Sequence, residues 1–237
     1  MKKTGRYLLS ILPLLLMFVI QIVAATIQMI RYLLLYGIEE GMLRYQGETD
    51  EVLMVVQFIT LLIMGSWYYL AVVRKKQKLG IAEESRFTWK AAGKLVLIGA
   101  GSYFLISALL VLWSLIAPGV IQEYAEMMEE TGLGSFTVVS MITSVVLAPL
   151  SEELTFRGLS LEYLKETGSA FWKLNVLQAL FFGIAHLNLV QGVYTFLIGL
   201  ILGYVAMKYR SLWASITLHA VINAMGSCIP FLLEMIM

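Results

Sequence analysis

The stretch YLLSILPLLLMFVIQIVAATIQMIRYLLL, residues Tyr7–Leu35, contains a single charged side chain, that of Arg31. It exceeds the roughly 18 apolar residues that indicate a helix crossing a bilayer. The basic residues before it are typical of a signal peptide, but the run is too long for one and lacks a small-residue cleavage site. We therefore predict that it forms the first membrane-spanning helix.

The composition of the whole chain of 237 residues also indicates a membrane protein. Hydrophobic residues make up 59% and charged residues only 14%, whereas soluble domains carry about 25% charged residues. The formal net charge of +1 gives no reason to expect nucleic acid as a partner. The single cysteine, Cys228, can form neither an internal disulfide nor a thiolate metal site. The composition predicts an integral, multi-pass protein whose solvent is the lipid bilayer.

Further apolar runs predict an all-α transmembrane helical bundle of about seven spans. After the first span we expect the others at about residues 52–73, 95–117, 136–165, 172–189, 193–207 and 212 to the C-terminus. The acidic segment 120–131 is predicted to be an amphipathic helix on the membrane surface. The sequence leaves open whether the chain also forms an eighth helix or a re-entrant segment. Because no repeat or long linker interrupts the chain, residues 1–237 are expected to form a single transmembrane domain.

The distribution of charge predicts how the bundle is oriented. Lysine and arginine gather at the N-terminus, in 74–94, in 157–173 and at 208–210, whereas the loops between these segments are acidic. Positively charged loops favour the cytoplasmic side. We therefore predict a cytoplasmic N-terminus and an external C-terminus. The compact loops favour a bacterial plasma membrane.

Charged side chains inside a span are costly, so those of the fourth span are candidates for function. Residues 151–157 read SEELTFR. Because residues four apart share a helix face, Glu153 and Arg157 are predicted to form an ion pair. Glu152 points elsewhere and is left as a carboxylate that could serve as a general base.

The two histidines of the chain lie in other spans. His186 belongs to the fifth and His219 to the seventh, where Asn223 follows four residues later on the same face. Counted from the basic residues at the helix ends, at about 1.5 Å per residue, Glu152, His186 and Asn223 lie about 20 Å deep and His219 about 14 Å. We therefore predict that these side chains converge on one intramembrane cavity that faces the cytosol.

Each motif alone also has a structural explanation. The pair of Glu153 and Arg157 could join helices, and a lone histidine is more often a satisfied core residue. His219 and Asn223 could form a hydrogen-bonded clasp between helices. The matching depth of both histidines and the spare carboxylate favours a site over three coincidences.

These residues resemble the motifs of the CPBP family, the CAAX proteases and bacteriocin-processing enzymes that are also called the Abi family. That family's pattern is Glu-Glu-x-x-x-Arg, then Phe-x-x-x-His, then His-x-x-x-Asn or Asp. The matching residues here are Glu152-Glu153…Arg157, Phe182…His186 and His219…Asn223. The resemblance covers about residues 136–225, the motif-bearing core. It implies an intramembrane endopeptidase similar to the type II CAAX prenyl endopeptidases.

The resemblance also implies roles for the motif residues. Glu152 and His186 would activate water, and His219 and Asn223 would stabilise the oxyanion. Glu153, Arg157 and Phe182 would support them. An older interpretation of the family makes it metal-dependent, with a divalent ion such as zinc held by Glu152, His186 and His219. The sequence leaves both mechanisms open and indicates no other cofactor.

The implied substrate is a membrane-associated peptide or lipidated protein, either of the CAAX type or a pheromone or bacteriocin precursor. A non-catalytic scaffold or bacteriocin-immunity protein of the same family is an alternative, although the intact motifs argue against it. A transporter is a third class, in which the charged groups would relay protons or bind substrate. The absence of an internal repeat and of polar groups across the full bilayer depth argues against a transporter.

Overall fold

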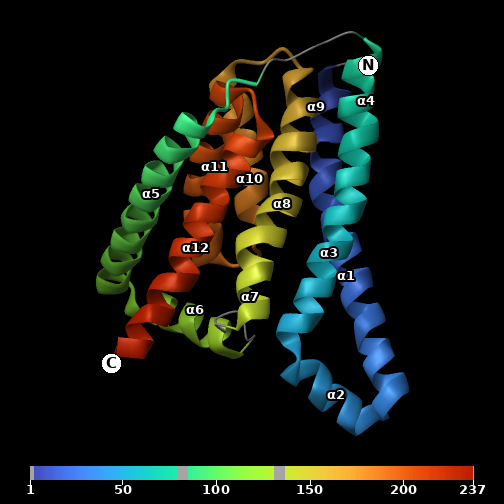
Figure 1. Ribbon diagram of the computed structural model, residues 1–237, viewed down its shortest axis with the longest axis vertical. Coiled ribbons are helices and arrows are strands. Elements are labelled where there is room, and N and C mark those ends of the chain that lie inside the picture. The colour runs from blue at the N-terminus through green and yellow to red at the C-terminus, as the bar shows by residue number, and fades with distance from the viewer. Residues whose placement is uncertain (1–2, 80–84, 131–136, 237) are drawn as a thin grey trace.

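The computed structural model describes residues 3–79, 85–130 and 137–236, and within them all side chains except those of 130 and 228–236. Helices form all of the regular structure in these residues, which confirms the predicted all-α class for them. Long helices that follow one another along the chain run antiparallel, and several shorter ones lie between them (Figure 1). The side chain of Cys228 lies outside the described part.

The first half of the chain forms a long hairpin. Its helices are α1 (Lys3–Tyr36), α2 (Ile38–Gly47), α3 (Thr49–Tyr68), the π-helix η1 (Tyr69–Val73) and α4 (Arg74–Lys78). Gly37 separates α1 from α2 with a φ of 81°, which glycine adopts without strain. The acidic segment 36–51, which joins the first two predicted spans, thus contains a helix. At 34 residues, α1 is about 51 Å long and exceeds a hydrocarbon core of about 30 Å. Its lower part therefore projects with α2 beyond the other helices (Figure 1).

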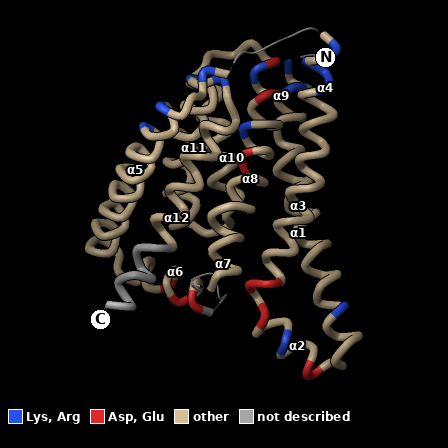
Figure 2. The backbone as a smooth tube through the Cα atoms, in the orientation of Figure 1, with Lys and Arg blue, Asp and Glu red and all other residues tan. Residues whose placement is uncertain are grey.

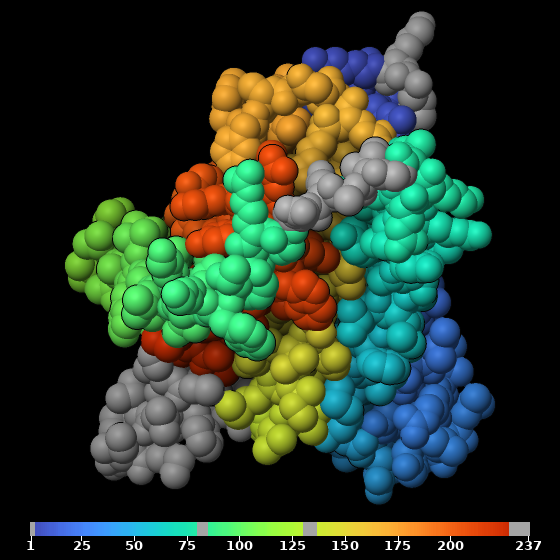
Figure 3. All heavy atoms as spheres, turned by 45° about the horizontal axis from the view of Figure 1, so that its top comes forward, coloured from blue at the N-terminus to red at the C-terminus, as the bar shows by residue number. Residues whose placement is uncertain are grey.

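The second half carries the motifs. Its helices are α5 (Trp89–Ile116), α6 (Pro118–Glu130), α7 (Val138–Ile142), η2 (Thr143–Leu147), α8 (Ala148–Glu153), η3 (Leu154–Ser160), α9 (Leu161–Lys165), α10 (Phe171–Ile184), α11 (Leu189–Tyr209) and α12 (Leu212–Ile236). From α7 to α9 the helix is continuous and contacts both α3 and α12. Figure 3 shows α5 at one edge, α1 to α4 at the other, and α12 with α7 to α9 between them.

Five helices within the described residues are long and apolar enough to cross a membrane. They are Lys3–Tyr36, Thr49–Lys78, Trp89–Ile116, Val138–Lys165 and Leu189–Tyr209. They correspond to the first four and the sixth of the predicted spans, and they fit an integral membrane protein. The end of α12 lies among the side chains that are not described, so the count of seven, with or without an eighth, stays a prediction.

The predicted fifth span is wrong at its end. It was expected to reach residue 189, but α10 stops at Ile184 and is only 14 residues long. Leu187 has a φ of 53°, a left-handed conformation that interrupts the helix. The side chain of Asn188 then accepts a hydrogen bond from the Gln191 amide and begins α11. Since its 14 residues span only about 21 Å, α10 is too short to cross a hydrocarbon core of about 30 Å, and it forms a hairpin with α11.

Charges separate to the two ends of the bundle, as the sequence predicts. Most lysines and arginines lie at the end that carries α4 and α9, and acidic residues gather at α2 and α6 (Figure 2). We call these the basic end and the acidic end. At the basic end, Glu166 pairs with Arg6 and Lys75, and Glu162 pairs with Lys76. These ion pairs join α1, α4 and α9. The cytoplasmic location of this end stays a prediction.

Glycines bring α10 and α11 into close contact. A Cβ atom at Gly183 would lie 2.7 Å from the carbonyl oxygen of Gly192, and one at Gly199 would lie 3.1 Å from Ala179 Cα. One at Gly203 would collide with Asn175 Oδ1 and Gln178 Nε2. Close approach at small residues is typical of membrane helices.

Replacing Gly203 with alanine should lower the free energy of unfolding by about 1–3 kcal/mol, because the new methyl group displaces two hydrogen-bonded side chains. Thermal unfolding in detergent measures the effect. Gly101→Ala is the matched control, since nothing lies within 4 Å of a Cβ there. An equal response of both variants would contradict close packing at Gly203.

Candidate active site

Two π-helical segments flank the short helix that carries the motif carboxylates. α8 ends at Glu153, with η2 before it and η3 directly after it. Each π turn alters the helical phase, and such turns are frequent at functional sites. The hydroxyl of Ser151 donates to Gln57 Oε1 at 2.9 Å, which ties α8 to α3. The directions in which Glu152 and Glu153 point about the helix axis therefore depend on both neighbouring π turns.

Glu153 and Arg157 form the predicted ion pair. Arg157 Nη1 lies 2.8 Å from Glu153 Oε1, and both side chains have no exposed surface. The same carboxylate oxygen lies 3.0 Å from His219 Nδ1. Because an ionised carboxylate can only accept a hydrogen bond, His219 donates from Nδ1. The carboxylate of Glu153 thus joins the fourth predicted span to the seventh.

Glu152 lies on the other side of the His219 ring. The distance from His219 Nε2 to Glu152 Oε2 is 3.7 Å, which is too long for a hydrogen bond but close enough for electrostatic interaction. The Glu152 side chain retains 17% of its exposure, whereas that of Glu153 has none. The structure therefore brings the predicted general base and His219 together, and it leaves Glu152 as the accessible carboxylate of the two.

The ring of Phe182 lies at the centre of the cluster. It meets the rings of His186 and His219 edge to face, with centroids 5.1 Å and 5.6 Å away. The guanidinium carbon of Arg157 lies 4.6 Å from its centroid, a distance typical of a cation–π contact. Phe182 thereby contacts the buried arginine and both imidazoles.

His186 lies in the turn between α10 and α11. Its Nδ1 atom is 2.9 Å from the carbonyl oxygen of Phe182. A carbonyl only accepts, so Nδ1 carries a proton, and in the neutral ring Nε2 keeps its lone pair. The end of α10 thus fixes the tautomer in which His186 can accept a proton at Nε2.

Asn223 lies one turn beyond His219 on α12, but its amide makes a different contact. Its Nδ2 atom donates to the backbone carbonyl of Ser144 at 2.8 Å. Ser144 belongs to η2, where π-type pairing alters the backbone hydrogen bonds. One amide hydrogen of Asn223 therefore stabilises this π turn, and the second remains for another acceptor.

Two further polar residues connect to the same cluster and lie outside the motifs. Gln178 and Asn175 are buried on α10. Asn175 Nδ2 donates to Leu200 O at 2.9 Å. Their polar side chains, three residues apart in a largely apolar span, were the sequence signal for them. Motif spacing alone could not reveal that they face α11.

Within the described residues, no three His, Cys, Asp or Glu side chains form a group that could hold a metal ion. The zinc ion expected at Glu152, His186 and His219 therefore stays a prediction. We derive no step through a metal.

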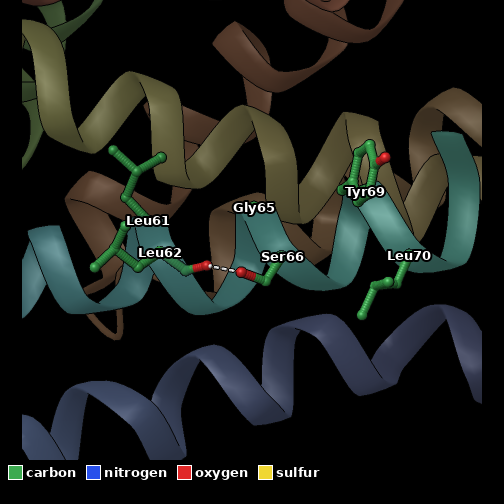
Figure 4. Close-up of a pocket in the computed structure, with 6 residues that line it drawn as sticks. All are labelled: Leu61, Leu62, Gly65, Ser66, Tyr69 and Leu70. Carbon is green, nitrogen blue, oxygen red and sulfur yellow. Dashed lines mark hydrogen bonds between the residues drawn. The ribbon is translucent and has the colours of Figure 1, made fainter. Parts of the chain in front are cut away.

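A separate pocket of about 490 Å³ lies on α3 and η1, away from these residues. Figure 4 shows its lining: Leu61, Leu62, Gly65, Ser66, Tyr69 and Leu70. The hydroxyl of Ser66 bonds to the carbonyl of Leu62 at 2.7 Å. The surface that remains is largely apolar, as expected of a face in contact with lipid. The predicted cavity facing the cytosol is a different feature and stays a prediction.

The fold and the cluster together define a class: a helical membrane protein with a carboxylate–imidazole site inside its bundle. Residues 134–225 match a family model described as type II CAAX prenyl endopeptidase Rce1-like. Neither a curated protein nor a solved structure matches the chain.

This match supports the resemblance to the CPBP family, because residues 134–225 are similar to the Rce1-like type II CAAX prenyl endopeptidases. It covers α7 to α11 and most of α12, and so contains all three motifs. The family consists of proteases that act on membrane-associated peptides.

Proposed function

We propose that this protein is an intramembrane endopeptidase that cuts a membrane-associated peptide, a CAAX protein end or a pheromone or bacteriocin precursor. The contact of His219 with Glu152 and Glu153 inside the bundle is the observation that carries the proposal. It unites a spare carboxylate with an imidazole that is oriented by a second carboxylate. That arrangement, in a segment matching a protease family, supports hydrolysis better than a purely structural role.

In the proposed reaction, Glu152 accepts a proton from water as the water oxygen attacks the peptide carbonyl carbon. His186 assists by accepting a hydrogen bond from the same water at Nε2, the atom left free by its bond to Phe182 O. Collapse of the tetrahedral intermediate breaks the C–N bond. The proton held by Glu152 then passes to the leaving amine.

The developing oxyanion is assigned to His219 and Asn223. His219 can donate from Nε2 while Nδ1 remains on Glu153 only when the ring carries both protons. Arg157, Glu153, His219 and Glu152 would then alternate in charge, with no net charge in a poorly solvated site. Asn223 contributes the amide hydrogen that Ser144 O leaves free.

The test uses the full chain reconstituted in liposomes, with a quenched peptide that ends in a farnesylated cysteine, two aliphatic residues and a variable residue. An unprenylated pheromone-precursor peptide serves as the second substrate. We expect cleavage at one peptide bond, with isotopically labelled water entering the new carboxyl group. Cleavage of neither peptide by the wild-type protein would overturn the proposal.

Replacing His186 with glutamine should lower kcat by about 10²-fold, since a glutamine whose amide donates to Phe182 O has no acceptor atom where Nε2 would hold the water. The turn between α10 and α11 should still form, because the glutamine amide can donate to Phe182 O. The comparison of initial rates and melting temperatures checks both expectations. A kcat equal to that of the wild-type protein would remove His186 from water activation.

A further inference from the structure

Gln178 is a fully buried amide on α10 that belongs to none of the motifs. It precedes Phe182 by one helical turn on the same face. A buried amide is costly unless it is hydrogen-bonded. Its Nε2 atom lies within 3.0 Å of three acceptors, namely Asn175 O, Asn175 Oδ1 and Gly199 O.

The carbonyl of Gly199 connects Gln178 to the arginine of the site. Its oxygen lies 2.9 Å from Gln178 Nε2 and 3.1 Å from Arg157 Nη2. Donors from two helices therefore converge on one backbone oxygen of a third. From Arg157 the contacts continue to Glu153 and then to His219. Gln178 begins a buried polar series that ends beside Glu152.

Both side chains that bind this carbonyl have one more polar atom without a protein partner. Among the described residues, Arg157 Nε and Gln178 Oε1 are buried and unpaired. The first is a donor and the second an acceptor. Ordered water commonly binds to such buried groups.

Two glycines of α11, Gly199 and Gly203, leave the space that these contacts require. A side chain at Gly203 would occupy the positions of Asn175 Oδ1 and Gln178 Nε2. At Gly199, a Cβ atom would crowd Ala179 and the ring of Phe182, so the absence of a side chain lets α10 approach closely. The two glycines thus leave space in which Gln178 reaches a backbone carbonyl of the neighbouring helix.

We propose that Gln178 is a positioning residue for the pair of Glu152 and His219. It holds the Gly199 carbonyl against Arg157, which fixes Glu153 and therefore the His219 ring. The expected effect of Gln178 on catalysis rests on the proposed function. Its expected effect on the position of the His219 ring is independent of that function.

The experiment replaces Gln178 with methionine, which has similar length but forms no such hydrogen bonds. Because the chain contains two histidines, labelled imidazole nitrogens give a simple magnetic resonance spectrum of the full protein in detergent, assigned with His186→Gln. We expect the Nδ1 signal of His219 to shift while that of His186 stays. We expect kcat to fall at least about 10-fold, with KM unchanged.

Thr60→Val is the matched control. Thr60 is fully buried on α3, and its hydroxyl donates to Val56 O at 2.8 Å, within its own helix. This variant should leave both histidine signals and kcat unchanged. Gln178→Asn, which is one methylene shorter and cannot reach Gly199 O, should reproduce the shift seen with methionine.

An unchanged His219 signal and kcat in both Gln178 variants would overturn the proposal, even if the melting temperature fell. Failure of both variants to fold, while Thr60→Val folds, would also overturn it, since Gln178 would then serve folding itself. If the wild-type protein cleaves neither peptide, the proposed function fails, but the His219 signal still decides the role of Gln178.

Discussion

Glu152→Gln should lower kcat for peptide cleavage by about 10²–10⁴-fold, the range that general acid–base groups contribute. Glutamine has nearly the same shape, but it cannot take a proton from water. The melting temperature should change little, because Glu152 is partly exposed and lies outside the buried Glu153–Arg157 pair. Initial rates in liposomes and thermal unfolding in detergent measure the two effects.

Glu123→Gln is the control for this variant. Glu123 is an exposed carboxylate on α6, at the acidic end. Its replacement should leave the rate unchanged. If Glu152→Gln kept more than about a tenth of the wild-type rate, well above the range expected for loss of a general base, Glu152 would not be the proton acceptor.

Arg157→Met should lower the free energy of unfolding by about 3–5 kcal/mol, because it leaves the carboxylate of Glu153 buried without its cation. The loss should also release the hydrogen bond to Gly199 O and the contact with the ring of Phe182. Thermal unfolding in detergent measures the change. Activity should fall as well, since Glu153 orients His219.

The double variant Glu153→Gln/Arg157→Met tests the cause of this loss. Removing both charges should restore part of the stability, because no uncompensated carboxylate remains. Arg44→Met, which breaks an exposed pair with Glu40 on α2, should have no measurable effect. A double variant less stable than Arg157→Met alone would contradict the assignment of Glu153 and Arg157 as mutually neutralising.

Local periodicity accounts for the parts of the site that the sequence predicted correctly. The ion pair of Glu153 and Arg157 follows from their separation by four residues on one helix. The approach of Glu152 to His219 followed from a comparison of depths along two helices. Both arguments need only the helical rise and pitch, which vary little between proteins.

Contacts between helices account for the parts that could not be predicted. Nothing in the motif spacing indicates that His219 bonds to Glu153, or that Asn223 donates to a carbonyl in η2. The early end of α10 was missed because Leu187 and Leu189 extend the apolar segment, although Leu187 and Asn188 break the helix. Hydropathy reports the solvent around a segment and not its backbone dihedral angles.

The sequence by itself determined a helical membrane protein with a charged pair and two histidines at similar depth, because apolar length and residue spacing act along a single helix. Only the tertiary structure decided which atoms meet. The rotation of α8 between two π turns, the turn at His186, and the approach of Gln178 to Gly199 arise from packing between helices. Those contacts join residues far apart in the chain, so no local pattern encodes them.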